Sequence, residues 1–318
     1  MHLYHRKMIE QIKISVIIPT YNRADVVGRA ILSALKQTYT PFEIIVIDDG
    51  SSDKTAETVR KFSNSVTYVE QKNSGPASAR NNGIQRSTGN YIAFLDSDDE
   101  WMPDKLEKQI ELINSKHAQV VITNSLFKNR SNSAETTFSK SLFSDLLNRF
   151  DSELTDCFPL LIEQNFIHLS TLLVQKSCLL EVGYFDEGMP VAEDTDLWLR
   201  LAFKYKFGII TTPLAIRDDR PDKLSGNKQK EYSGRLYMFS KFLRSEADLS
   251  SEKKDLIRQR QYFIRGRFMN SLFQKSDYIS LLKNIFSTNP AYLTSKYFYK
   301  GYYWNSKEFS ASKNEISE

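Results

Sequence analysis

Three carboxylates follow one hydrophobic segment of the chain and form its strongest chemical signal. Asp96, Asp98 and Asp99 come directly after the apolar run Tyr91–Leu95, which predicts a buried strand. Carboxylates held together at one strand end repel each other unless a cation or solvent relieves them. Mg²⁺ and Mn²⁺ prefer such oxygen ligands. The segment therefore indicates a metal site, with a solvated acidic turn as the structural alternative.

A second acidic pair, Asp48 and Asp49, ends the apolar run Glu43–Ile47. Parallel strands end at the same edge of a sheet, so both acidic groups can face one cleft. The alternative is a segment that only forms a turn and caps a helix. Arg80 lies in the segment 75–83, where its guanidinium can bind a phosphate or a base carbonyl, or form an ordinary surface ion pair. None of these groups identifies a ligand alone.

Two further carboxylates, Glu193 and Asp194, begin a segment whose apolar residues recur at helical spacing as far as Phe203. An ionised carboxylate at this place can act as a general base, and the positive end of a helix dipole favours the ionised form. Helix capping alone would also explain Asp194. Asp196 is a weaker candidate for the same role.

These groups need a scaffold, and the first part of the chain predicts one from alternating strands and helices. Apolar runs predict five strands, at 14–18, 43–47, 66–70, 91–95 and 119–123. Helical segments separate them, at 26–35, 53–62, from Pro76 to shortly before Gly89, and from Pro103 to about Ser115. This alternation predicts an α/β fold with a doubly wound, mostly parallel sheet flanked by helices, whose ligands lie beyond the carboxyl ends of the strands.

The pattern changes further along the chain. Residues 124–149 are rich in Ser, Asn and Thr and predict an insertion over the sheet, with a helix at 141–150. Ser170–Val174 is typical of a strand and Asp194–Phe203 of a helix. Beyond about residue 227 the sequence predicts a helical, basic and aromatic extension. We therefore divide the chain into a catalytic domain, 1–225, and a C-terminal region, 226–318.

Composition narrows the class of protein. The chain has 318 residues, 41% of them hydrophobic, and two cysteines without metal-binding spacing, so we expect a globular protein of the cytoplasm. No segment predicts a signal peptide or a membrane-spanning helix. Residues 228–318 hold 17 Lys and Arg against 9 Asp and Glu, a net +8, whereas residues 1–227 carry −4. This split favours an anionic partner for the tail, such as the inner membrane surface, over a nucleic acid.

The order of these motifs resembles the inverting glycosyltransferases of family 2, which have the nucleotide-diphospho-sugar transferase fold called GT-A. The resemblance covers residues 14–210. It rests on Ser15-Val-Ile-Ile-Pro-Thr-Tyr-Asn22, Ile47-Asp-Asp-Gly-Ser-Ser-Asp53, Ala79-Arg-Asn-Asn-Gly83, Phe94-Leu-Asp-Ser-Asp-Asp-Glu-Trp101, Gly183-Tyr-Phe-Asp-Glu187 and Glu193-Asp-Thr-Asp-Leu-Trp-Leu-Arg200.

The resemblance implies a role for each matching position. The donor nucleotide would be bound by Pro19, Thr20, Tyr21, Asp49, Arg80 and Asp96. Asp98, alone or with Asp99, would bind the divalent cation, Mn²⁺ or Mg²⁺. Asp194 would be the general base. On the acceptor side we place Glu193, Trp101 and His168, although a structural role in packing is the favoured alternative for Trp101 and His168.

The predicted function is metal-dependent, inverting transfer of a sugar from a nucleotide-sugar donor, UDP-linked, to a hydroxyl of a glycan. A lipid-linked acceptor in cell-surface polysaccharide synthesis is the favoured class. Transfer from such a donor needs a cation to stabilise the departing diphosphate and a carboxylate to accept the proton of the attacking hydroxyl. Two alternatives stay open: a non-catalytic nucleotide-sugar or glycan-binding protein on the same fold, and a sugar nucleotidyltransferase.

Overall fold

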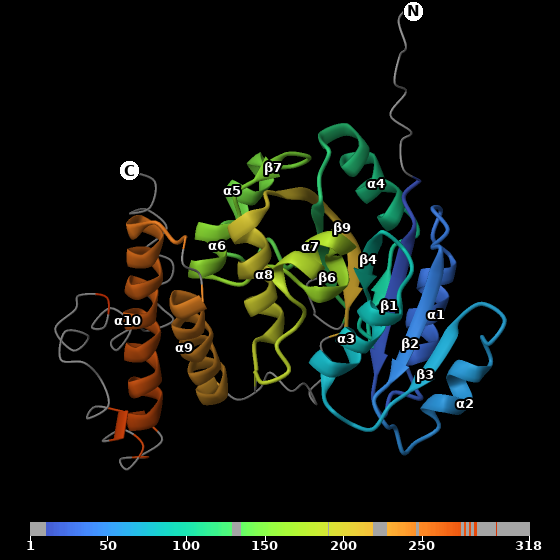
Figure 1. The fold of residues 1–318 in the computed structure, drawn as a ribbon, viewed down its shortest axis with the longest axis horizontal. Helices are drawn as coiled ribbons and strands as arrows, with labels where there is room; N and C mark the ends of the chain where they lie inside the picture. Colours follow the sequence, from blue (N-terminus) through green and yellow to red (C-terminus); the bar gives the residue numbers. More distant parts are fainter. Residues whose placement is uncertain are drawn as a thin grey trace, which may run out of the picture.

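One mixed sheet with helices on both faces forms the body of the molecule (Figure 1). The computed structural model describes residues 11–128, 135–189, 191–218, 228–245 and 248–274, and also residues 277, 280, 283, 284 and 297. Within this part of the chain the sheet has nine strands, in the order β3-β2-β1-β4-β8-β6-β9-β5, with β7 paired to β9. The predicted α/β fold is confirmed.

The strands are β1 (Ile14–Thr20), β2 (Glu43–Asp48), β3 (Thr67–Glu70), β4 (Tyr91–Phe94), β5 (Glu100–Trp101), β6 (Val120–Phe127), β7 (Leu154–Thr155), β8 (Leu173–Gln175) and β9 (Phe207–Arg217). The helices are α1 (Val27–Leu35), α2 (Thr55–Arg60), α3 (Pro76–Arg86), α4 (Lys105–Lys116), α5 (Ser144–Arg149), α6 (Phe158–Glu163), α7 (Lys176–Val182), α8 (Glu193–Lys204), α9 (Lys228–Ser245) and α10 (Ser251–Gln274). A short 3-10 helix, η1, spans Leu169–Thr171.

The parallel half of the sheet matches the sequence pattern closely. β1 lies between β2 and β4, β3 lies outside β2, and these pairs are all parallel. Every residue of β1 is buried, because α1, α2 and α4 pack on one face of the sheet while α3 and α8 pack on the other. The carboxyl ends of β1, β2 and β4 therefore meet at one edge.

The prediction of a strand over Ser170–Val174 is wrong in its first half. Thr171 donates both its backbone N–H and its hydroxyl to the carbonyl oxygen of His168, which closes the 3-10 helix η1. These turn hydrogen bonds compete with a strand ladder. β8 begins only at Leu173 and runs antiparallel to both β4 and β6. The turn places His168 and Ser170 beside the end of β4.

The strand β9 was not predicted, and β6 extends beyond the strand predicted at 119–123. β9 pairs in parallel with β6 along the whole of the latter, with register shifts on both sides of Asn124. Pro213 lies within β9 and cannot donate a ladder hydrogen bond, so the segment lacks the pattern of a central strand. The register shifts at Asn124, the residue of β6 opposite Pro213, accommodate this proline. The carboxyl end of β9 carries Arg217 to the same edge as the ends of β1 and β4.

The C-terminal helices α9 and α10 pack side by side against the sheet domain (Figure 1). Phe242 of α9 lies 5.7 Å, between ring centroids, from both Phe158 of α6 and Phe203 of α8. This aromatic cluster belongs to the same hydrophobic core as the strands. The boundary expected near residue 225 lies outside the described residues. None of the helices that the structure describes is long and apolar enough to cross a membrane.

Two helical glycines allow a test of how tightly the scaffold is packed. A Cβ at Gly83 of α3 would lie 2.4 Å from Cγ2 of Ile17 in β1, whereas a Cβ at Gly28 of α1 would meet nothing closer than 3.5 Å. We expect Gly83→Ala to lower the free energy of unfolding by about 1–3 kcal/mol through overpacking. Gly28→Ala should raise it by up to about 1 kcal/mol through helix propensity. Urea unfolding measures both, and equal effects would contradict the described packing of α3.

Candidate active site

A cavity of about 770 Å³ opens at the edge where β1, β2, β4 and β9 end. Nine of the residues singled out in the sequence line it, namely His168 and eight residues from four separate motifs: Pro19, Thr20, Tyr21, Asp49, Arg80, Asp96, Asp98 and Asp99. Asn22, Arg23, Asn73, Gly75, Pro76, Ala79, Ser97 and Arg217 complete the lining. The chain thus brings together groups that lie almost 200 residues apart.

The carboxylate of Asp49 shapes one wall of the cavity. One of its oxygens accepts hydrogen bonds from Gln71 and from the backbone N–H of Ser74, and the other accepts one from the N–H of Gly75. Gly75 has a φ of +90°, a conformation that favours glycine, and α3 begins at the next residue. Asp49 therefore fixes the entry to α3, which carries Arg80.

Arg80 connects two distant carboxylates beneath the cavity. Its Nη2 lies 3.3 Å from Oδ1 of Asp96, after β4, and its Nη1 lies 2.9 Å from Oε1 of Glu193, at the start of α8. The guanidinium is buried and lies over the ring of Phe185, 5.4 Å from its centroid. Burial alone would lower its pKa, but the charges of Asp96 and Glu193 outweigh this and raise the pKa. Arg80 is a permanent cation that joins the strand end to α8.

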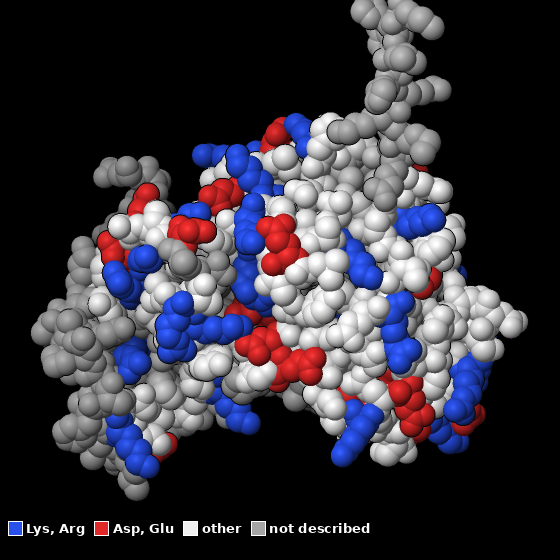
Figure 2. Space-filling view, in the orientation of Figure 1, with Lys and Arg blue, Asp and Glu red and all other residues white. Residues whose placement is uncertain are grey.

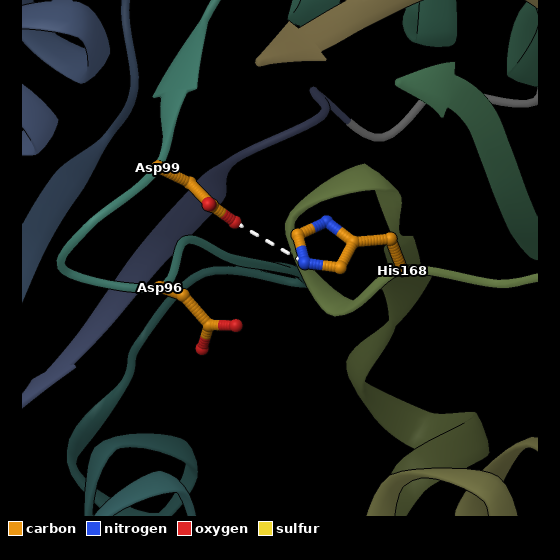
Figure 3. A group of neighbouring side chains, drawn as sticks. All are labelled: Asp96, Asp99 and His168. Carbon is orange, nitrogen blue, oxygen red and sulfur yellow. Dashed lines mark ion pairs between the residues drawn. The ribbon is translucent and has the colours of Figure 1, made fainter. Parts of the chain in front are cut away.

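Two carboxylates and an imidazole form a compact group on one side of the cavity (Figure 3). One ligand atom from each of Asp96, Asp99 and His168 lies within 4.8 Å of the other two. Asp99 points at the ring, with Oδ2 3.3 Å from Nε2 of His168. Asp98 lines the same cavity outside this group. Two oxygens and a nitrogen at this spacing suit a divalent cation such as Mn²⁺.

Asp99 is buried, and its neighbours hold it in a fixed place. Burial raises its pKa well above the ordinary value, and the charges of Asp96 and Asp98 raise it further. The hydroxyl of Ser170 donates to one oxygen of Asp99 over 2.6 Å, and the N–H of Asp218 donates to the other. The same hydroxyl accepts the N–H of Asp96. One side chain on η1 therefore positions the carboxylate of Asp99 and the backbone of Asp96.

Asp194 lies in the first turn of α8, next to Glu193. Burial raises its pKa to about 6, and the charge of Glu193 adds to this, whereas Arg80 opposes it. The helix dipole considered in the sequence analysis favours the ionised form, whereas burial, the largest effect, opposes it. At pH 7 the group is still mostly ionised, and a carboxylate with such a pKa is well matched to general-base work near neutrality.

Asp196 has a structural environment instead. It is 1% exposed and accepts a bidentate ion pair from Arg200, four residues further along α8. Its other oxygen lies 3.3 Å from Nζ of Lys241 on α9. These contacts attach α9 to α8, so the weaker candidate for the base is already used in packing.

Trp101 lies in the core and not along the cavity wall. It is 4% exposed, and its indole N–H donates to the carbonyl oxygen of Ser170 over 2.7 Å. Nζ of the buried Lys105 lies 4.2 Å from the centroid of its ring. This is the packing role that the sequence left open for it. Through this hydrogen bond to Ser170 the indole stabilises η1.

Sequence reasoning missed several groups at the cavity. Arg23 and Arg217 line it as cations, and Ser170 bonds Asp99 on its acidic side. Arg23 directly follows the first quoted segment, Ser15–Asn22, and this position could have identified it as a candidate site residue. Arg217 could not be found, because the strand that carries it was not predicted. Buried atoms without a hydrogen-bond partner among the described residues include Oγ1 of Thr20, Nε of Arg80 and Nε of Arg217.

A mixed sheet with its acidic group at the strand ends is the architecture of GT-A glycosyltransferases, and comparisons identify the family. The family model "Glycosyl transferase family 2" matches residues 15–164, and "Glycosyl transferase family group 2" matches residues 91–304. An uncharacterised glycosyltransferase of Rickettsia typhi is 31% identical over 84% of this chain and 81% of its own length. The chain belongs to glycosyltransferase family 2.

Further similarities are more limited in extent or identity. TuaG of Bacillus subtilis, named for teichuronic acid biosynthesis, is 43% identical over 31% of this chain and 41% of its own. Three other rickettsial relatives are matched over only about a third of their length. The crystal structure of Staphylococcus aureus TarS 1–349 with UDP-GlcNAc aligns with a TM-score of 0.62, at 18% identity, over 96% of this chain and 92% of that one. A mannosyltransferase of Pyrobaculum calidifontis with GDP-Man and Mn²⁺ gives 0.59, at 16% identity, over 98% and 89%.

The hydroxyl of Ser170 offers a test of how the acidic group is held. Ser170→Ala leaves a buried oxygen of Asp99 and the N–H of Asp96 without this partner, and we expect a loss of about 1–3 kcal/mol in the free energy of unfolding. Ser115→Ala is the control, because that hydroxyl only donates to the carbonyl of Leu112 within α4. Chemical denaturation compares the two. Equal, small losses would show that Ser170 does not position the carboxylates.

Proposed function

We propose that this glycosyltransferase moves a sugar from a nucleotide-sugar donor, UDP-linked, to a hydroxyl of a glycan or lipid-linked acceptor, with inversion and with a divalent cation bound. Cell-surface polysaccharide synthesis is the proposed setting. The observation that carries the proposal is one cavity whose lining includes the nucleotide-binding motifs and the acidic group, with Arg80 connecting it to the helix of Asp194. The complexes of TarS with UDP-GlcNAc and the name of TuaG support this choice.

The lining fits a nucleoside diphosphate. Oγ1 of Thr20 is a buried hydroxyl oxygen available to a base or ribose, beside the half-exposed ring of Tyr21. Nε of Arg217 is available to an anion at the opposite end of the same edge. A guanidinium binds phosphate oxygens in a fixed geometry. We assign the base to the Thr20 side and the diphosphate to the side of Arg217 and the acidic group.

The acidic group fits a divalent cation by its donor set of two carboxylates and an imidazole. Asp96, Asp99 and His168 are proposed ligands as members of this group, and Asp98, which lines the same cavity, is proposed as a further ligand. When bound, the cation would stabilise the negative charge of the departing diphosphate. It would also relieve the mutual repulsion of the carboxylates, which raises the pKa of Asp99. Mn²⁺ or Mg²⁺ is proposed because oxygen ligands predominate.

Asp194 is the proposed general base. Its carboxylate would accept the proton of the attacking acceptor hydroxyl, on the face of the sugar opposite the departing diphosphate, which gives inversion. Arg80 lines the cavity and pairs with Glu193, the residue before Asp194, and its positive charge favours the ionised form of Asp194. Glu193 acts through Arg80 in this scheme, as a positioning residue.

The C-terminal region is proposed to bring the enzyme to its acceptor on the inner face of a membrane. Its net charge of +8 would attract an anionic bilayer at about 1 kcal/mol per basic residue near the surface. In Figure 2, basic side chains lie over α9 and α10. The division into a catalytic domain, 1–225, and a C-terminal region, 226–318, belongs to the same proposal.

The metal assignment is tested by donor binding. We expect UDP to bind much more tightly with Mn²⁺ than with EDTA, and Asp98→Asn to weaken binding in Mn²⁺ while the melting temperature is maintained. Removing one of three clustered carboxylates relieves repulsion, so the variant should fold. Asp104→Asn, at a half-exposed carboxylate paired with Lys108, is the control. Calorimetric titration gives the affinities, and equal values with and without Mn²⁺ would refute metal dependence.

The base assignment is tested by kcat. Asp194→Asn should lower kcat for release of UDP by about 10²- to 10⁴-fold with little change in donor affinity, since general-base catalysis contributes that much. In the wild type, kcat should fall as the pH decreases through about 6, because protonation of Asp194 removes the base.

Two variants control this assignment. Asp196→Asn should mainly destabilise the fold, because it breaks the buried pair with Arg200. Glu193→Gln should retain more activity than Asp194→Asn. An active Asp194→Asn together with an inactive Glu193→Gln would place the base one residue earlier.

A further inference from the structure

The segment Gly183–Glu187 carries part of the family resemblance, yet none of its residues is among those that line the cavity. It lies between α7 and α8, and Asn81 of α3 holds its middle. The Asn81 side chain accepts the N–H of Phe185 over 3.0 Å and donates to its carbonyl oxygen over 2.9 Å. The ring of Phe185 in turn packs against the guanidinium of Arg80, the cation that pairs with Glu193. The segment therefore supports the link between the cavity and α8.

Lys241 of α9 joins this segment to the first turn of α8. Its Nζ lies 2.6 Å from Oδ2 of Asp186 and 3.3 Å from Oδ1 of Asp196. Asp196 is buried, and its other oxygen pairs with Arg200, whose guanidinium also donates to the carbonyl oxygens of residues 182–184. One ammonium group on α9 thus bonds both the loop before α8 and the helix itself.

A second contact of α9 lies on the other side of Asp194 in the sequence. A Cβ at Gly234 would lie 2.3 Å from Cγ2 of Val191 and 3.1 Å from its carbonyl oxygen, so the two backbones approach closely here. Gly234 and Lys241 are seven residues apart, about two helical turns, and therefore lie on the same face of α9. In Figure 1, α9 stands beside α8. This face of α9 contacts the chain three residues before Asp194 and two residues after it.

The start of α8 depends on such contacts because its backbone is unusual. Ala192, directly before the helix, has a φ of +66°, a left-handed conformation that residues other than glycine seldom adopt. The N–H of Asp196 donates to its carbonyl oxygen over 3.0 Å. A turn in this conformation persists only where the surrounding structure holds it. Asp194 lies within this turn, so its place depends on what holds residues 191 and 196.

We propose that Lys241 is a positioning residue for Asp194, so that sugar transfer requires α9 to be packed on α8. The inference rests on the proposed function, because it takes Asp194 as the general base. Lys241 is not among the residues that line the cavity, so its loss should affect the transfer step and leave donor binding unchanged. A base displaced by about 1 Å loses much of its effect. Because α9 belongs to the C-terminal region, the contact also connects that region with the base.

The first measurement separates positioning from donor binding. Lys241→Met keeps the length of the side chain and removes the ammonium group. We expect kcat for release of UDP to fall at least about tenfold, while the affinity for UDP in Mn²⁺, measured by calorimetry, stays within about threefold of the wild type. Lys241→Arg should recover most of the lost kcat, since a guanidinium can also bond both carboxylates.

Lys204→Met is the matched control, because it removes the same charge from the far end of α8, where Lys204 pairs with Glu181 at 2.9 Å. It should keep the wild-type kcat. Asp186→Asn is the second variant if Lys241→Met does not fold, since it removes the shorter of the two ion pairs of Lys241 and should lower kcat in the same way. A folded Lys241→Met or Asp186→Asn with the wild-type kcat would overturn the proposal.

A second measurement does not depend on sugar transfer. Hydrogen exchange of backbone amides in the full chain should be faster over residues 183–189 and 191–196 in Lys241→Met than in the wild type or Lys204→Met, with β1 unchanged. Faster exchange together with an active Asp194→Asn would refute the proposed base but support the contact of α9 with α8. If Asp194→Asn is inactive while Lys241→Met exchanges and transfers as the wild type does, the positioning role of Lys241 alone is refuted.

Discussion

The pairing of Arg80 with Asp96 and Glu193 is the interaction on which the arrangement of the site depends. A buried guanidinium needs carboxylate partners, and here they come from the end of β4 and the start of α8. Helix α8 contributes no residue to the cavity lining, so without this ion pair nothing described at the cavity would fix where Asp194 lies. Loss of Asp96 or Glu193 would leave the buried guanidinium of Arg80 with only one of these two carboxylate partners. The same ion pairs thus link α8 to the end of β4 and balance the charge of Arg80.

The same ion pair also sets the electrostatics of the site. The lining of the cavity combines the acidic side chains of Asp96, Asp98 and Asp99 with the cationic side chains of Arg23 and Arg217. Arg80 lies between the acidic group and Asp194, and its charge limits how far burial and Glu193 can raise the pKa of Asp194. With a pKa of about 6, Asp194 therefore remains mostly ionised near neutrality. Besides burial, the charges that set the pKa of Asp194 are those of Glu193 on α8 and Arg80 on α3.

Much of the fold and of the candidate site could be predicted from the sequence, and the predictions that were wrong or missing have physical causes. The strands of the parallel half are uniformly apolar runs between helices, a pattern that can be recognised within each segment. The residues at the ends of these strands could therefore be predicted as site candidates. The strand β9 is interrupted by Pro213 and depends on pairing with β6, so Arg217 was missed. The turn η1 was mistaken for a strand because Ser170 and Thr171 suit both structures. Its hydrogen bonds to His168 decided the outcome, and no local pattern could show that Ser170 would reach both Asp96 and Asp99.

The place of β9 in the sheet has a consequence for how the protein is made. β5 pairs with β9 through Trp101 and Ala215, and the N–H of Asp218 completes the hydrogen bonds of Asp99. These contacts join residues more than a hundred positions apart, so they cannot form until the ribosome has released the chain beyond residue 218. Until then a nascent chain can build the parallel half of the sheet, but the acidic group lacks part of its support. Pairings of such long sequence separation form slowly, so the enzyme acquires its site late in synthesis, after most of its scaffold has folded.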